Sequence, residues 1–192
     1  MLPLNNCSIT SIYGENRQGR FHRGMDMISA SGDRLVKAIS SGIVRVIAYE
    51  EDGFGYYTTI QQQDGYRAIY AHLDSINVQT GQIIEAGDVI GIEGNTGNST
   101  GIHLHLELRS EPYSTSDSID IATYLGIENK TGLVRPLTQF EIGQEIEALQ
   151  YLIENGRITS GDYWLNALMI VRNLDFLFIK WANDVAYLNL YM

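Results

Sequence analysis

Short runs of β-favouring residues separated by glycines most restrict the fold of this chain. Five such runs lie between residues 41 and 109, with the sequences SGIVRVIAYE, GYYTTIQQQ, GYRAIYAHL, GDVIGIEG and GIHLHLELR. Pairs such as Asp64-Gly65 and Gly94-Asn95 punctuate this region, and they are typical of tight turns that need a positive φ. Several short strands at this spacing predict a mainly β domain built from an antiparallel sheet or sandwich.

The composition changes near residue 130, and the change predicts a second domain. A polar segment around Pro112 closes the first domain, which we place at residues 1–130. In residues 131–192, Thr138 and Glu141 have the spacing of a capping box, and Leu137 can pack against Ile142. The stripe that follows consists of Ile142, Ile146, Leu149 and Ile153. This stripe predicts a first helix with one buried face. Two further helices are expected, one after Ser160 and one through residues 178–188, so the sequence predicts a small C-terminal α-helical bundle.

Charge and cysteine content exclude several functional classes. The 192 residues carry a formal net charge of -10, so nucleic acid is not an expected partner, because binding phosphates requires clustered Lys and Arg. The sequence has no run of about 20 apolar residues, so it predicts no membrane insertion. The N-terminus lacks the pattern of a signal peptide. Cys7 is the single cysteine, which excludes an internal disulfide and a multi-thiolate zinc site. We interpret Cys7 as having no chemical role.

The four histidines of the chain lie in three segments that can each contribute to a metal site. In GIHLHLELR, period-2 alternation places His103, His105 and Glu107 on one strand face. The opposite face, expected in the core, consists of Ile102, Leu104, Leu106 and Leu108. The spacing suits one histidine binding a metal and the other contacting its water or substrate. Taken alone, it is more typical of a solvated strand face with two ordinary histidines.

The two other segments strengthen the metal hypothesis by their combination. In FHRGMDM, His22 and Asp26 bracket Gly24 and form an imidazole and carboxylate pair of the kind that binds zinc, although a surface ion pair would have the same spacing. In IYAHLDS, alternation places His72 on the strand face of Tyr70 and Ala68. A lone histidine of this kind is usually structural. The occurrence of every histidine in these segments favours one shared site.

These motifs, in this order, resemble the M23 peptidases, the lysostaphin and LytM-like zinc endopeptidases of bacterial cell walls. The resemblance runs through H-x-G-x-D at His22, Gly24 and Asp26, through Y-A-H-L at residues 70–73, and through GDVIGIEGNTGNSTGIHLHLEL at residues 87–108. It covers about residues 8–127. It implies an M23-type β domain that hydrolyses peptide bonds of the stem peptide or cross-bridge of peptidoglycan.

The resemblance also implies which residues do the chemistry. His22, Asp26 and His105 would bind one Zn²⁺ per chain, and His72 and His103 would be the catalytic pair. Three protein ligands leave a position for a water, whose pKa zinc lowers to about 7. Glu107 is expected either to orient a ligand or to be an ordinary solvated glutamate. The glycine-rich residues 94–101 are expected either to approach the substrate closely or only to form the turn before His103.

The expected partner is peptidoglycan, and the alternative function is a non-catalytic M23-like scaffold that binds the wall or takes part in assembly. The short sequence before the peptidase motifs resembles phage-encoded lysins. A protein without a signal peptide would be made in the cytoplasm and would reach the wall after holin-type release or within a phage particle. Residues 131–192 would serve wall targeting, docking into a phage particle or formation of a homodimer.

Overall fold

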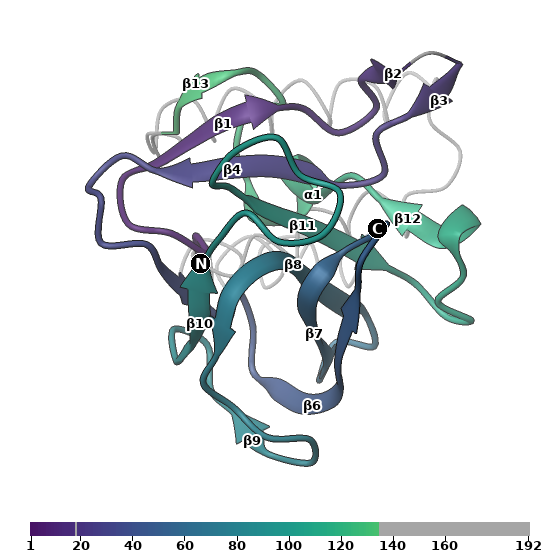
Figure 1. Cartoon of the computed structure of the whole chain (residues 1–192). Helices are drawn as coiled ribbons and strands as arrows, with labels where there is room; N and C mark the ends of the chain where they lie inside the picture. Colours follow the sequence, from purple (N-terminus) through teal and green to yellow (C-terminus); the bar gives the residue numbers. More distant parts are fainter. Residues whose placement is uncertain (18, 135–192) are drawn as a thin grey trace, which may run out of the picture. The chain divides into compact units, whose positions relative to one another are not determined.

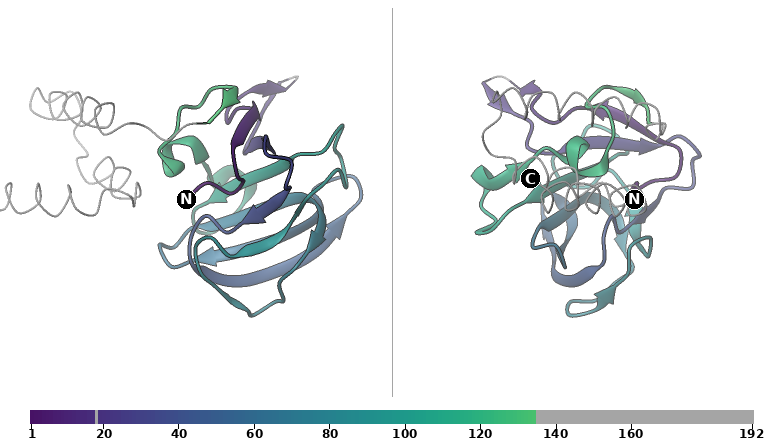
Figure 2. Two further views of the ribbon diagram at one scale, coloured as in Figure 1. Left: turned by 90° about the vertical axis from the view of Figure 1, so that its left-hand side faces the viewer. Right: turned by 180° about the vertical axis from the view of Figure 1, so that it is seen from behind.

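The computed structural model of the protein describes residues 1–17 and 19–134, which lie within one compact unit, Met1–Arg135. Eleven strands of the described residues form one antiparallel sheet, and its main path runs β13-β1-β4-β11-β8-β7-β6-β9 (Figures 1 and 2). The expected mainly β, antiparallel domain is therefore confirmed. The predicted C-terminal helices lie outside the described residues, so that bundle and the division into residues 1–130 and 131–192 stay predictions.

The strands on the main path differ greatly in length. They are β13 (Gly132–Leu133), β1 (Cys7–Ser11), β4 (Met25–Ser29), β11 (Leu104–Arg109), β8 (Arg67–Ile76), β7 (Gly55–Gln62), β6 (Gly42–Glu50) and β9 (Ile83–Ile84). Beside this path, β10 (Val89–Glu93) pairs with β8 and with β5 (Leu35–Lys37), and β12 (Ser118–Ile119) pairs with β11. A separate hairpin joins β2 (Asn16–Arg17) and β3 (Arg20–Phe21).

Two short helical segments lie near the end of the described chain. The 3-10 helix η1 spans Thr115–Asp117, and α1 spans Ile121–Leu125. The Asp120 side chain accepts a hydrogen bond from the Ala122 N–H at the start of α1, and Gly126 ends the helix in the left-handed conformation. Within the described residues, no helix has the length and apolar character needed to cross a bilayer.

The core lies beneath one face of β4, β11 and β8. Leu106 pairs with Met25 on one side and with Tyr70 on the other, and Leu104 pairs with Met27. All of these side chains are fully buried. The expected burial of the alternating leucines of β11 is therefore confirmed. Ile102 departs from the expectation: it precedes the first residue of β11, and 51% of it is exposed.

Cys7 lies on the edge-proximal strand β1 and is fully buried. Burial and the nearby charge of Glu93 raise the pKa of the Cys7 thiol to about 12, so it stays protonated at neutral pH. Because the thiolate is the reactive form, we expect a thiol-specific disulfide reagent to modify Cys7 only after denaturation. Absorbance of the released thiol anion measures this. Rapid stoichiometric reaction of the folded protein would contradict the burial.

Candidate metal centre

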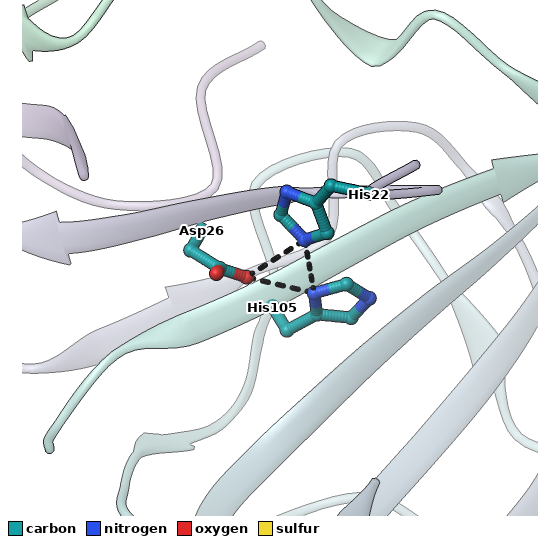
Figure 3. Close-up of side chains that lie close together, drawn as sticks. All are labelled: His22, Asp26 and His105. Carbon is teal, nitrogen blue, oxygen red and sulfur yellow. Dashed lines mark hydrogen bonds and ion pairs between the residues drawn. The ribbon is translucent and has the colours of Figure 1, made fainter. Parts of the chain in front are cut away.

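The register of β4 against β11 brings two of the predicted ligands together. Asp26 and His105 are direct cross-strand partners, so their side chains project from the same face of the sheet, opposite the buried methionines and leucines. His22 lies between β3 and β4 and reaches the same point. Figure 3 shows the three side chains converging. One donor atom from each of these buried residues lies within 4.8 Å of the other two.

The distances between the donor atoms suit a single ion. Asp26 Oδ1 lies 2.7 Å from His105 Nδ1 and 3.2 Å from His22 Nε2, and the two imidazole nitrogens are 3.1 Å apart. Bonds of about 2.0–2.1 Å at tetrahedral angles would separate the donors by about 3.3 Å. Small adjustments would therefore seat a zinc-sized cation among the three atoms.

Hydrogen bonds on the outer sides of both imidazoles orient their inner nitrogens. The Nδ1–H of His22 donates to the Ile12 carbonyl at 2.9 Å, and the Nε2–H of His105 donates to Glu107 Oε1 at 3.2 Å. These tautomers leave two nitrogen lone pairs and a carboxylate oxygen directed at one another. Such a convergence needs a cation or added protons between the donor atoms.

Protonation is the alternative in the absence of a metal. Burial disfavours the charged form of His105, but its hydrogen bonds with Asp26 and Glu107 outweigh this and raise its pKa. Burial also opposes ionisation of Asp26, yet hydrogen bonds from His105 and His22 keep the pKa of this carboxyl far below its ordinary value. The three side chains therefore stabilise positive charge at the position where a metal would bind.

A β-bulge brings His72 to the same site. The sequence predicted that His72 shares a strand face with Tyr70, and because His105 pairs with Ala71, that face is the one directed at the core. That prediction is wrong: His72 has a φ of 60°, and its ring centroid lies 4.7 Å from that of His103 and 5.8 Å from that of His105. The left-handed backbone conformation turns the side chain out of the alternating pattern and toward the metal-binding residues.

His72 and His103 are held by matching hydrogen bonds. The Nδ1–H of His72 donates to the Thr96 carbonyl at 2.8 Å, and that of His103 donates to the Gly101 carbonyl at the same distance. Their Nε2 atoms are left for the site, and His103 Nε2 lies 3.7 Å from Asp26 Oδ1. Burial lowers the pKa of His72 to about 4, so it is neutral at pH 7. All five predicted residues are thus brought together, as two groups within one site.

The glycine-rich residues 94–101 have a structural task. Gly94 forms an isolated bridge with His103, whose N–H donates to the Gly94 carbonyl at 2.9 Å. A Cβ at Gly94 would overlap the backbone of β8 next to His72. The segment therefore carries the carbonyls and the turn that orient both histidines, and the close approach to a substrate that was also expected of it stays a prediction.

Several residues at the site had not been identified from the sequence. The Phe54 ring stacks on His105 with a centroid distance of 5.8 Å, and Arg109 Nε donates to Glu107 at 2.9 Å. Arg17 Nη2 lies 2.5 Å from Asp26 Oδ2, which holds the second carboxylate oxygen away from the histidines. The sequence shows Arg17 nine residues before Asp26, as a charge near the ligands. The direction of its side chain could not be predicted, because it depends on the β2–β3 hairpin.

Gly24 provides a direct test of the ligand geometry. A Cβ at this position would lie 2.7 Å from His105 Cε1 and 2.5 Å from the Leu106 carbonyl oxygen. We expect Gly24→Ala to displace the His105 ring and to weaken metal binding by at least about tenfold, in the range found for disturbed ligand surroundings. Competition with a chromophoric chelator measures the affinity. Gly101→Ala is the matched control, because its Cβ would meet no atom within 4 Å. Equal affinities of the two variants would contradict the argument.

The comparisons with known proteins agree with this geometry. The model of peptidase family M23 matches residues 20–120, which include the three donor residues and both further histidines. Lysostaphin of Staphylococcus simulans is 35% identical over 122 residues, covering 62% of this chain and 24% of the relative. Peptidoglycan DD-endopeptidase ShyB of Vibrio cholerae is 32% identical over 124 residues, covering 62% of this chain and 28% of the relative.

A solved structure gives the same result in three dimensions. The catalytic domain of lysostaphin from Staphylococcus simulans matches with a TM-score of 0.51 and 35% identity, covering 57% of this chain and 83% of that domain. The aligned region spans only about a quarter of the two curated relatives. Since the family model covers more than half of the 192 residues, this chain is a member of peptidase family M23.

Proposed function

We propose that this protein is a zinc-dependent endopeptidase that hydrolyses peptide bonds of bacterial peptidoglycan. The observation that carries the proposal is the convergence of His22, Asp26 and His105, whose three donor atoms lie within 4.8 Å of one another. Relatives support the substrate class, because one is a peptidoglycan DD-endopeptidase and another a glycyl-glycine endopeptidase.

Zinc suits this donor set. Two imidazoles and one carboxylate are the ligand types of catalytic zinc sites, and three protein ligands leave a coordination position open. The bound ion would lower the pKa of water to about 7 and polarise the carbonyl of the scissile peptide. Arg17 holds Asp26 Oδ2, so that Oδ1 is the oxygen directed at the metal position.

His72 and His103 would carry out the proton transfers. Each has its Nδ1–H bound to a backbone carbonyl and presents Nε2 to the site. A neutral Nε2 can accept a proton from the attacking water, and the same atom, once protonated, can donate to the carbonyl oxygen or to the leaving amine. The close approach of the two rings, 4.7 Å between centroids, lets them serve one bound peptide together.

The division of labour gives a two-part prediction. We expect His22→Ala or His105→Ala to lose both bound zinc and activity, because each removes a ligand. His72→Ala or His103→Ala should retain about one zinc per chain and lose at least about a hundredfold in kcat, the usual range for a general acid or base. Elemental analysis of purified variants and release of new amines from peptidoglycan measure the two properties.

The outcomes separate the proposed function from its alternative. A wild-type protein that binds no zinc would favour the non-catalytic scaffold. Full activity in His105→Ala would contradict the ligand assignment, and full activity in both His72→Ala and His103→Ala would contradict their catalytic roles. Targeting, docking or dimerisation by residues 131–192, and release from a phage-infected cell, stay predictions that these measurements do not address.

Glu107 is expected to support metal binding through His105. Glu107 is buried, accepts the His105 Nε2–H and is itself bound by Arg109. Glu107→Gln removes the negative charge that makes His105 a stronger ligand, so we expect zinc affinity to fall about 10- to 100-fold. Competition with a chelator measures it, and Glu85→Gln, at an exposed position, is the control. An unchanged zinc affinity would show that Glu107 serves only as the partner of Arg109 and does not support the metal ligand.

A further inference from the structure

Two arginines project from the β2–β3 hairpin on the side of the metal site. Arg17 and Arg20 are direct cross-strand partners, so their side chains leave the hairpin on the same face. That face is fixed by Arg17, whose Nη2 contacts Asp26 Oδ2 at 2.5 Å and Ser11 Oγ at 2.6 Å. Figure 1 shows the hairpin standing beyond the end of β1, next to the start of β4. We call Arg17 and Arg20 the arginine pair.

The arginine pair places two like charges directly opposite each other. Like charges directly opposite each other in a hairpin repel. Asp26 and Glu15 balance Arg17, with N–O distances of 2.5 and 3.7 Å. Arg20 is exposed and forms no ion pair with any residue of 1–17 or 19–134. The hairpin thus presents the Arg20 guanidinium without a carboxylate partner among the described residues, on the face whose other arginine contacts Asp26.

A bound metal would strengthen this local positive charge. A divalent ion held by one carboxylate and two neutral imidazoles keeps a net positive charge, and Asp26 would then balance Arg17 less completely. The chain as a whole has the opposite character, with a net charge of -10. A positive site on an acidic protein directs anionic groups to that site and away from the remaining surface.

The other side of the site differs in charge. The Phe54 ring stacks on His105, and the Phe54 carbonyl accepts the His72 N–H at 2.8 Å. The exposed acidic residues Glu51 and Asp52 lie just before Phe54 in the turn between β6 and β7. A peptide bound across the site would therefore meet positive charge at the hairpin and negative charge at this turn, which distinguishes its two directions.

We propose that the arginine pair is a carboxylate-binding subsite, and that the substrate is a stem peptide with a free carboxylate near the scissile bond. Arg20 contacts that carboxylate, because the planar guanidinium can donate two parallel hydrogen bonds to it. Arg17 is a positioning residue that also keeps Asp26 in place. An uncharged glycine bridge would leave Arg20 without a partner. This inference rests on the proposed peptidoglycan endopeptidase function.

The test compares three defined substrates: a cross-linked stem-peptide dimer with free carboxylates, the same dimer with those groups amidated, and pentaglycine. We expect the wild-type zinc protein to prefer the free-carboxylate dimer about tenfold in kcat/KM, the value of one charge-assisted contact. Arg20→Gln should abolish the preference through KM and keep its zinc. Arg45→Gln, at an exposed position on β6, should retain the preference.

Substrate binding to a variant that cannot cleave the substrate separates the subsite proposal from the proposed endopeptidase function. Isothermal titration of the free-carboxylate dimer into zinc-loaded His103→Ala, with and without Arg20→Gln, should give dissociation constants about tenfold apart. Equal dissociation constants would overturn the subsite. So would an equal effect of Arg20→Gln on the cleavage of all three substrates, or a preference of the wild type for the amidated dimer or for pentaglycine. A zinc-loaded wild type that cleaves none of the substrates would instead contradict the proposed function, and the titration would still decide the subsite.

Discussion

The cross-strand pair of Asp26 and His105 is the constraint on which the rest of the site depends. A shift of one residue in the register of β4 against β11 would pair Asp26 with a leucine. Either Asp26 would then face the core with Met25 and Met27 at the surface, or His105 would face the core with the leucines of β11 at the surface. Burial of the apolar residues thus fixes the positions of the polar ones. The core and the metal centre are two faces of the same strand pairing.

The site departs from regular β structure where the chemistry requires it. His72 belongs to a strand whose alternation would bury it with Tyr70, and a positive φ redirects it to the other face. Such a backbone conformation costs on the order of 1–3 kcal/mol for a residue with a Cβ. Hydrogen bonds from the His72 backbone to Phe54 and from its ring to Thr96 hold the conformation in place.

The electrostatics extend outward from the metal position in layers. Glu107 and Arg109 lie behind His105, while Arg17 and Glu15 lie behind Asp26. His105 and Asp26 are therefore each oriented by a charged neighbour, which is itself paired, whereas His22 is oriented by the Ile12 carbonyl. Beyond these pairs the hairpin presents Arg20 and the β6–β7 turn presents acidic residues. Orientation of the donors and selection of the substrate thus use neighbouring parts of one charge network.

Much of this arrangement could be predicted from local sequence. Period-2 alternation in β11 fixed the buried leucines and the shared face of His103, His105 and Glu107, because neighbouring side chains of a strand must point in opposite directions. The ordered motifs around His22, His72 and His103 identified the family, which the family model then showed. The same pattern failed at Ile102 and His72, which lie where the regular strand begins or bulges.

Only the tertiary structure decided what depends on pairing between distant segments. The strand register set which residue faces Asp26, the hairpin set the direction of Arg17 and Arg20, and the β6–β7 turn brought Phe54 onto His105. The contacts of His105 with Asp26 and with Phe54 do not follow from spacing along the chain, because each joins backbone segments whose relative position is set by burial of the whole core. Arg17 and Arg20 pair locally, but the contact of Arg17 with Asp26 depends on where the hairpin lies. The sequence by itself determined the chemical groups available to the site, and the packing of the sheet determined how they meet.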